Sequence, residues 1–158
     1  MVPLAIATGA GARHPAVTRA RDTRLDAFRT ALQEVMTDLA QQIVRDGEGA
    51  EKFVTIQVRG AASEASARRA ALVVANSPLV KTAIAGADPN WGRLVMAIGR
   101  SGERIRLEKM VIAIGGQTVA RGGKELPSYR EDEAARHMQG RDINFDLDLA
   151  VGSGAATV

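Results

Sequence analysis

The spacing of apolar residues changes along this chain from a helical period to a strand period, and this change constrains the fold more than any other feature. Between Asp22 and Asp46, apolar side chains recur every three or four residues, which predicts an amphipathic helix. From Phe53 to Arg59, and again from Ile143 to Leu149, apolar and polar residues alternate, as in strands with one buried face. A chain that carries both periods must cover a sheet with helices, so we expect an α/β (α+β) fold of layered sheets flanked by helices.

The segments between these three also carry helix and strand signals. Asp22, Ser63 and Ser77 are placed as N-caps, and Pro78 is typical of a first helical position. The pair Gly115–Gly116 lies between two apolar runs and predicts a hairpin turn. The other expected helices span 64–75, 78–85, 91–99 and 130–138, and the other expected strands span 4–7, 104–107, 110–114 and 117–120.

Two expectations concern packing. The apolar stripe of the long helix consists of Leu25, Phe28, Leu32, Val35, Leu39 and Ile43. Full burial of such a side chain is worth roughly 1.5–3 kcal/mol, so we expect this helix to be a main element of the core, ending at Asp46–Gly47. Gly60 is expected to end the first alternating strand. Residues 152–158 read as a turn followed by the first residues of a strand, which we expect to be cut before it can pair.

Composition narrows the class of protein. A chain of 158 residues can bury one sizeable core, and we expect residues 1–158 to form a single partial domain. With 46% hydrophobic and 25% charged residues the chain resembles a globular protein, and it has no apolar run long enough to span a membrane. The absence of cysteine excludes disulfides and thiolate nucleophiles and fits a cytoplasmic location. The net charge of +3 arises from scattered basic residues, which argues against a nucleic-acid-binding face.

Glu48 is the strongest candidate for a binding residue. It lies in the loop expected between the long helix and the first alternating strand, flanked by Gly47 and Gly49. Glycines allow a tight turn and let a ligand approach the backbone closely. The alternative is an ordinary surface turn whose glutamate is solvated or paired with Lys52.

The segment Asp88–Arg93, with the sequence Asp-Pro-Asn-Trp-Gly-Arg, is the second loop that combines charge with glycine and proline. Asp88 or Asn90 is expected to cap the following helix, whose N-terminus could favour an anion. Structural capping together with packing of Trp91 is the simpler explanation and the one that we favour.

Other polar residues give weaker signals. His14 and His137 have no second histidine or cysteine at the spacing of metal ligands, so no metal site is expected. Asp146 and Asp148 share one face of a strand, which permits acid–base chemistry, although a solvated face is favoured. Gly9-Ala10-Gly11 lacks the full phosphate-loop fingerprint and reads as a turn.

Together, the segments 44–53 and 88–93 resemble the ornithine acetyltransferases of arginine biosynthesis, and the resemblance runs in register from Leu4 to Val158. These enzymes, also called glutamate N-acetyltransferases, move an acetyl group from N-acetylornithine to L-glutamate. The resemblance implies part of the C-terminal (beta) chain, truncated at both ends, with the fold of these enzymes and of self-cleaving aminopeptidases incomplete here. It also implies that Glu48 contacts the amino-acid end of the substrate. At position 51 this chain has glutamate where the family usually has threonine. This difference bears on the fine specificity for substrate and not on the role of Glu48.

The resemblance implies a threonine nucleophile that self-cleavage frees as a new N-terminus, upstream of the matched region. Thr8, Thr18 and Thr23 do not begin the chain, so none can take that role. We therefore expect no catalytic residue in this chain, no metal and no organic cofactor, with acetyl-CoA as a co-substrate in many members. The expected partners are N-acetylornithine, L-glutamate and the N-terminal (alpha) chain of the same precursor, in a cytoplasmic homo-oligomer of alpha–beta pairs with no nucleic acid or membrane.

The isolated chain is accordingly predicted to be inactive. Two other functions remain open from the sequence. The first is a non-catalytic remnant or interaction module that retains part of the fold. The second is membership of a related group of self-cleaving aminopeptidases, which fits the two motifs less well.

Overall fold

The computed structural model describes residues 15–158. The expected strand 4–7, the turn at 9–11 and His14 lie outside the described residues. The chain divides into two compact units, Met1–Ala50 and Glu51–Val158, and each is described here by itself. The prediction of a single partial domain over 1–158 stays a prediction.

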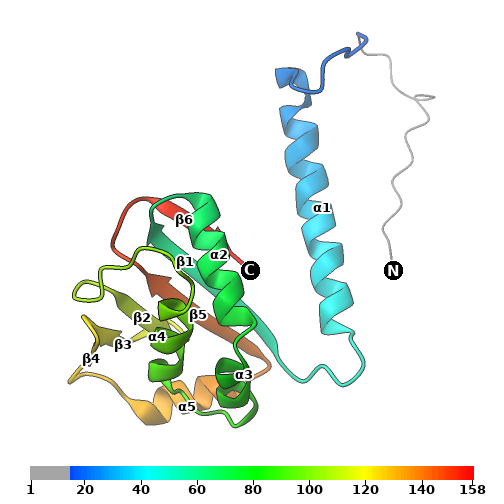
Figure 1. The fold of residues 1–158 in the computed structure, drawn as a ribbon. Coiled ribbons are helices and arrows are strands. Elements are labelled where there is room, and N and C mark those ends of the chain that lie inside the picture. The colour runs from blue at the N-terminus through cyan, green and yellow to red at the C-terminus, as the bar shows by residue number, and fades with distance from the viewer. Residues whose placement is uncertain (1–14) are drawn as a thin grey trace. The chain divides into compact units, whose positions relative to one another are not determined.

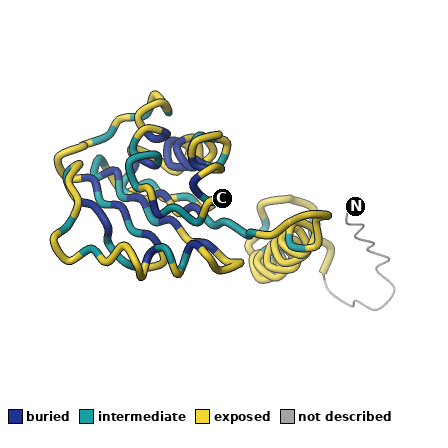
Figure 2. The backbone as a smooth tube through the Cα atoms, turned by 90° about the horizontal axis from the view of Figure 1, so that it is seen from below, coloured by how far each residue is buried: buried dark blue, intermediate teal, exposed yellow. Residues whose placement is uncertain are grey.

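The first unit contains the predicted long helix. The Asp22 side chain caps a short 3₁₀ helix, η1 (Thr23–Leu25), and not the long helix itself, which follows directly as α1 (Asp26–Arg45). The backbone N–H of Asp46 donates to the carbonyl of Gln42 at 2.9 Å, so the helix ends where the sequence predicted. The expectation that α1 is a main core element is wrong, because none of its residues is buried (Figure 2). An amphipathic stripe predicts that one face seeks a partner, but it does not specify the partner.

The second unit is built on a mixed six-stranded sheet with the order β4-β3-β2-β5-β1-β6 (Figure 1). The two central strands, β5 and β1, run parallel, and every other neighbouring pair is antiparallel. The strands are β1 (Phe53–Ala61), β2 (Val111–Ile114), β3 (Gln117–Arg121), β4 (Lys124–Glu125), β5 (Asp142–Asp148) and β6 (Gly154–Thr157). The predicted α/β class is therefore confirmed. The short edge strand β4 carries no periodic signal and was not predicted.

Four helices accompany the sheet: α2 (Glu64–Ala75), α3 (Pro78–Ala85), α4 (Trp91–Gly99) and α5 (Glu131–Gln139). The predicted starts of α2 and α3 are confirmed, since Ser63 accepts a hydrogen bond from the N–H of Ser66 and Ser77 accepts one from the N–H of Val80. Pro78 occupies the first turn of α3, where a missing N–H costs nothing. Serine caps thus start the first two of the three successive helices between β1 and β2.

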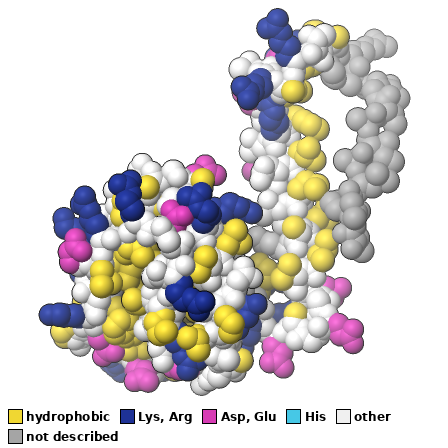
Figure 3. Space-filling model, in the orientation of Figure 1, with side chains coloured by type: hydrophobic (Ala, Val, Ile, Leu, Met, Phe, Trp, Pro, Cys, Tyr) yellow, Lys and Arg dark blue, Asp and Glu magenta, His cyan; other side chains and the backbone are white. Residues whose placement is uncertain are grey.

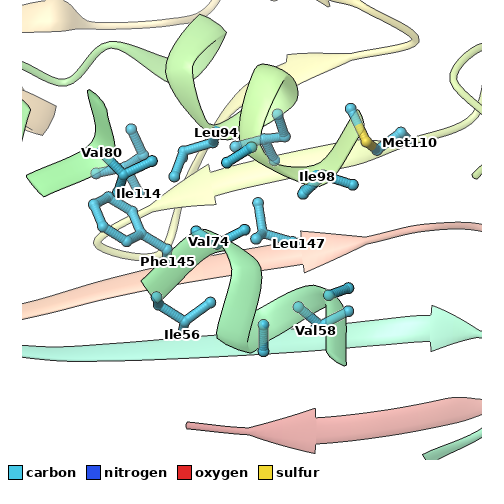
Figure 4. Close-up of a cluster of buried hydrophobic side chains, with 14 of the residues drawn as sticks. Ile56, Val58, Val74, Val80, Leu94, Ile98, Met110, Ile114, Phe145 and Leu147 are labelled. Carbon is cyan, nitrogen blue, oxygen red and sulfur yellow. The ribbon is translucent and has the colours of Figure 1, made fainter. Parts of the chain in front are cut away.

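The core lies on one face of the sheet. Along β5, Ile143, Phe145 and Leu147 are buried, and the residues between them are exposed or half-buried. The buried side chains of β1 and β2 point to the same face, where α2 and α4 supply Val74, Leu94 and Ile98 (Figure 4). Alanines on the buried face of α2, such as Ala67 and Ala71, are fully buried, which agrees with close packing of this helix.

Two strand predictions near the sheet edges are wrong. Residues 104–107 form no strand: residues 102–106 are irregular, and a turn begins at Leu107, where Lys109 and Met110 donate to the carbonyl of Arg106. The last strand is also not cut before it can pair. β6 runs antiparallel to β1, and the N–H groups of Ile56 and Val158 each donate to the other residue's carbonyl, at 2.9 and 3.1 Å. Pairing with the distant strand β1 decided the second outcome, and a local pattern cannot report such pairing.

Gly60 does not end β1, contrary to the prediction. It forms an irregularity in the pairing between Val58 and Ala61 and adopts a φ of +67°, and the strand resumes for one residue. A Cβ at this position would collide with the Asp148 carboxylate on β5. Glycine is therefore required here both by the backbone angle and by the close approach of the neighbouring strand.

A buried polar contact fastens the loop between α4 and β2 onto α2. Ser66, the one polar residue buried among residues 15–158, donates its hydroxyl to Glu103. The Arg69 guanidinium donates to the other oxygen of the same carboxylate at 2.6 Å. The hydrogen bond from Arg69, followed by that from Ser66, lowers the pKa of Glu103 below its ordinary value.

Truncation of the Leu147 side chain is expected to destabilise the second unit. Leu147 is fully buried on the central strand β5, so Leu147→Ala should lower the free energy of unfolding by about 2–5 kcal/mol. Leu79→Ala on α3 is the control, because Leu79 is 43% exposed and its loss should cost far less. Urea titration followed by Trp91 fluorescence measures both, and equal losses would contradict the described core.

The pH dependence of stability should report the Glu103 contact. Since the folded pKa of Glu103 is lowered, its stabilisation is complete above the ordinary value of about 4.5 and is lost as the pH falls through the folded pKa. Glu103→Gln should therefore make the free energy of unfolding depend less on pH below about pH 5, over a range on the order of two pH units. Urea midpoints measured across this range test it. Parallel curves for the two proteins would show that Glu103 does not contribute.

Candidate functional site

Glu48 lies in a tight turn just beyond the end of α1. The N–H of Ala50 donates to the carbonyl of Gly47 at 2.9 Å, which closes a four-residue turn with Glu48 second and Gly49 third. Gly49 has a φ of +73°, and open space surrounds the position that a Cβ would occupy. The backbone angle, and not crowding, is therefore what favours glycine at this position.

The carboxylate of Glu48 has no partner among the described residues. The residue is exposed, and it forms no hydrogen bond or ion pair with any residue from 15 to 158. An ionised carboxylate is an acceptor only, with two oxygens, and it therefore suits an ammonium or amide N–H donor. The turn holds the side chain in the position that the sequence predicted, and its role in binding stays a prediction.

Lys52 does not pair with Glu48, so the ion pair considered as an alternative role for Glu48 is not formed. Its ammonium donates to three carbonyls at the end of α5, those of Met138, Gln139 and Gly140, at 3.0, 2.9 and 2.9 Å. The last carbonyls of a helix have no partner within the helix and carry a partial negative charge, so a cation is favoured there. The N–H of Phe53 also donates to the carbonyl of Arg141 at 2.7 Å. The first residues of β1, which follow the Glu48 turn, are thus fixed to the α5–β5 junction.

The Asp88–Arg93 motif closes the corner between α3 and α4. The Arg93 guanidinium donates to the Leu79 carbonyl at 3.1 Å and to the Thr82 hydroxyl at 2.7 Å, and it lies 3.7 Å from the Asp88 carboxylate. The indole N–H of Trp91 donates to Glu125 on β4 at 3.3 Å. These contacts all lie within the fold and agree with a structural role.

The capping expectation for this motif is only partly right. Asn90 is the N-cap residue of α4, but its side chain makes no capping hydrogen bond. The Asn90 amide instead donates to the Asp88 carboxylate at 3.4 Å. Asp88 is therefore engaged with Asn90 and Arg93, which share the same turn.

Two of the remaining sequence candidates, His137 and Asp148, are held in structural contacts. His137 accepts a hydrogen bond from the N–H of Asn144 at 3.0 Å. Asp148 accepts one from the N–H of Ala150 at 2.9 Å and lies 3.3 Å from Arg59. Within residues 15–158, no group of acidic or histidine side chains is arranged to hold a metal ion. No helix in this part of the chain combines the length and apolar character needed to cross a membrane.

A surface cavity of about 310 Å³ opens between α2, α3 and α4. Its lining is mainly apolar, with Arg100 as the only charged residue: Leu72, Val73, Asn76, Ser77, Pro78, Ala97 and Arg100. The Asn76 amide donates to the carbonyl of Leu72, so it is already engaged. The only hydroxyl in this lining is that of Ser77, which caps α3, and no carboxylate or imidazole stands beside it to activate it.

Comparison with known proteins identifies the family. A family model described as the ArgJ family matches residues 2–158. This chain belongs to the ArgJ family. It is 50% identical over 154 residues to the arginine biosynthesis bifunctional protein ArgJ of Brucella melitensis, and the match covers 96% of this chain and 37% of that protein. The protein of the same name from Rhizobium meliloti is 51% identical over 154 residues, with the same shares covered.

A solved ArgJ structure supports the same assignment. The crystal structure of ArgJ from Bacillus halodurans at 2.00 Å resolution aligns with a TM-score of 0.82 and 36% identity, covering 91% of this chain and 68% of the solved chain. The resemblance inferred from two motifs is therefore confirmed at the level of family and fold. This chain spans little more than a third of the length of the curated ArgJ relatives that it matches.

Replacement of Lys52 should loosen the start of β1. Lys52→Met keeps much of the side-chain volume but removes three charge-assisted hydrogen bonds, so the free energy of unfolding should fall by about 1–3 kcal/mol. Amide hydrogen exchange at Phe53 and Val54 should accelerate as well. Lys81→Met is the control, because Lys81 is exposed on α3 and should change neither quantity. Unchanged exchange in Lys52→Met would show that the cap does not hold the strand.

Proposed function

We propose that this chain is part of an ornithine acetyltransferase, a glutamate N-acetyltransferase of arginine biosynthesis, and that Glu48 is its substrate-binding residue. The observation that carries the proposal is the family match over residues 2–158, within which a carboxylate that has no partner among residues 15–158 stands on a turn of defined geometry. The names of the relatives, which describe a bifunctional protein of arginine biosynthesis, support the same pathway.

The proposed reaction is an acetyl transfer in two steps. A threonine hydroxyl outside this chain attacks the acetyl carbonyl of N-acetylornithine, the C–N bond breaks, and ornithine leaves with a proton on its α-amino group. The amino group of L-glutamate then attacks the threonine ester, which yields N-acetylglutamate and regenerates the hydroxyl. Oxyanion donors for the tetrahedral intermediates also lie outside this chain.

Glu48 would act on the amino-acid end of each substrate. Ornithine and glutamate both carry an α-nitrogen, and a carboxylate can accept hydrogen bonds from its N–H groups. A fixed acceptor at this point would orient the nitrogen toward the ester carbon, and orientation of reacting groups is a large part of enzymatic rate enhancement. The turn geometry suits this role because it holds the backbone of Glu48 while leaving the side chain exposed.

Several further properties belong to the same proposal. The isolated 158 residues are expected not to turn over substrate, because the nucleophile is supplied from elsewhere. No metal or organic cofactor is needed, and acetyl-CoA can serve as an alternative acetyl donor. The partners are N-acetylornithine, L-glutamate and the N-terminal (alpha) chain, in a cytoplasmic oligomer of alpha–beta pairs.

A non-catalytic interaction module is the second candidate function. The observation that favours it is the exposed apolar stripe of α1, which suits association more than chemistry. The two functions differ in one respect that can be measured, because a module would associate with a partner without supporting acetyl transfer or depending on Glu48.

A chimaera tests the proposed role of Glu48. Residues 2–158 would replace the matched segment of the Brucella melitensis ArgJ protein, and acetyl transfer from N-acetylornithine to glutamate would be followed by ornithine release. We expect the chimaera to be active and Glu48→Gln to lower kcat/KM roughly 10- to 100-fold, the effect of losing a hydrogen bond to a charged group.

Glu34→Gln is the matched control, since it makes the same change at an exposed position on α1 that lies outside the matched motif. It should leave kcat/KM within about twofold, because surface changes away from a site have small effects. A folded but inactive chimaera would favour the module, and equal effects of the two substitutions would remove Glu48 from the binding site. Transfer by the isolated 158 residues would contradict the predicted inactivity.

A further inference from the structure

The cavity between α2, α3 and α4 is formed by the second unit alone. Every residue that lines it lies between Leu72 and Arg100, so its shape is set within one compact unit. Its volume of about 310 Å³ is at the lower end of the range of ligand pockets, roughly 300–1,000 Å³. Ala97 lines it and is 3% exposed, and its small side chain leaves this space unfilled. The cavity therefore has the size for a small organic molecule.

The apolar surface of the cavity continues onto the surrounding helices. Leu72 lines the cavity and is 39% exposed. Met96 is 56% exposed and lies one helical turn before Arg100, on the same side of α4. In the face drawn in Figure 3, hydrophobic side chains of the second unit lie beside Lys and Arg side chains. Because burial of apolar surface is favourable, an occupant with a hydrocarbon part would gain free energy from contact with this surface.

The polar groups of the cavity have hydrogen-bonding capacity that the described residues do not use. The guanidinium of Arg100 forms no hydrogen bond or ion pair with any residue from 15 to 158. Ser77 accepts a hydrogen bond from the N–H of Val80, which leaves its hydroxyl hydrogen for donation. Asn76 donates its amide to the Leu72 carbonyl, which leaves its side-chain oxygen as an acceptor. No carboxylate lines the cavity, so no residue of the lining neutralises the charge of Arg100.

This combination of groups specifies the class of the occupant. A guanidinium can bind a carboxylate through two parallel N–H···O hydrogen bonds, and such a pair is strengthened beside apolar surface, where the local dielectric is low. We propose that this cavity binds a small molecule with one carboxylate and an aliphatic chain. The carboxylate lies on Arg100, and the chain packs against Leu72, Val73 and Ala97. The inference goes beyond the proposed function and does not depend on it, because it uses no residue of the Glu48 turn.

Occupation of the cavity should also stabilise the second unit. The lining joins the last turn of α2, the start of α3 and the end of α4. A ligand that binds the folded chain and not the unfolded one raises the free energy of unfolding as its concentration rises above its Kd. The expected consequence is a higher urea midpoint in the presence of the ligand.

Three probes with the same aliphatic chain test the inference on the 158-residue protein. Octanoate carries the proposed carboxylate, 1-octanol is its neutral counterpart, and octylammonium carries the opposite charge. Each would be titrated below the concentration at which it aggregates. Nuclear magnetic resonance measures Kd from shifts of the amide signals, and nuclear Overhauser effects locate the probe against the methyl groups of Val73 and Ala97.

Two variants separate the charge of the site from its volume. Arg100→Gln removes the charge, and its control is Arg104→Gln, which makes the same change at an exposed position outside the lining. Val73→Phe fills part of the cavity from a half-buried position and keeps Arg100. The near-ultraviolet circular dichroism of Trp91 should be the same in all of these chains, which separates loss of binding from loss of folding.

We expect octanoate to contact Val73 and Ala97, to raise the urea midpoint and to bind about 10-fold more tightly than 1-octanol, with octylammonium weakest. Arg100→Gln should weaken octanoate binding about 10-fold and abolish its advantage over 1-octanol, the effect of losing hydrogen bonds to a charged group. Val73→Phe should weaken all three probes, and Arg104→Gln should weaken none.

Several results would overturn the inference. Octanoate that contacts neither Val73 nor Ala97, or that contacts only α1, would show that the cavity is not its site. Equal binding to the unchanged chain and to Arg100→Gln would remove the carboxylate from the proposal, as would 1-octanol bound as tightly as octanoate. Unchanged binding to Val73→Phe would show that the probe lies on the surface and not in the cavity.

Discussion

The parallel pairing of β1 with β5 supports the rest of the second unit. The two strands lie 80 residues or more apart in the sequence, and their register aligns seven residues from Phe53↔Asp142 to Arg59↔Asp148. This register brings Ile56, Val58, Phe145 and Leu147 to one face, where the helices cover them. The two outer edges of this strand pair are hydrogen-bonded to further strands, with β6 beside β1 and β2 beside β5. Because a one-residue slip would turn every apolar side chain to the uncovered face, the whole core depends on this pairing.

The candidate site belongs to the first unit, where the Glu48 turn is closed by its own hydrogen bond from the N–H of Ala50 to the carbonyl of Gly47. In the second unit, the Lys52 ammonium on the end of α5 and the bond from Phe53 to Arg141 hold the first residues of β1. Loops are a common location for binding residues, and each of these two segments has identifiable hydrogen bonds of its own.

Sequence reasoning succeeded where the determining interaction is local. The serine caps at Ser63 and Ser77, the glycine hairpin turn at 115–116 and the end of α1 at Asp46 depend on residues within one helical turn. It failed at two contacts that are distant in the sequence, because β6 pairs with β1 and Lys52 reaches α5 more than 80 residues away. It also failed at two places where the decisive contact is short-range: residues 104–107 alternate like a strand but form none, and the Asn90 side chain turns to Asp88 instead of capping α4.

The sequence by itself determined the α/β class, most element boundaries, the family and the position of Glu48 in a glycine-flanked turn. These features depend on periodicity, capping and motif, all of which are written locally. Only the tertiary structure decided the strand order, the pairing of β6, and the partners of Lys52 and Arg93. The physical reason is that apolar periodicity specifies which face of an element must be covered, whereas long-range packing and hydrogen bonding decide what covers it.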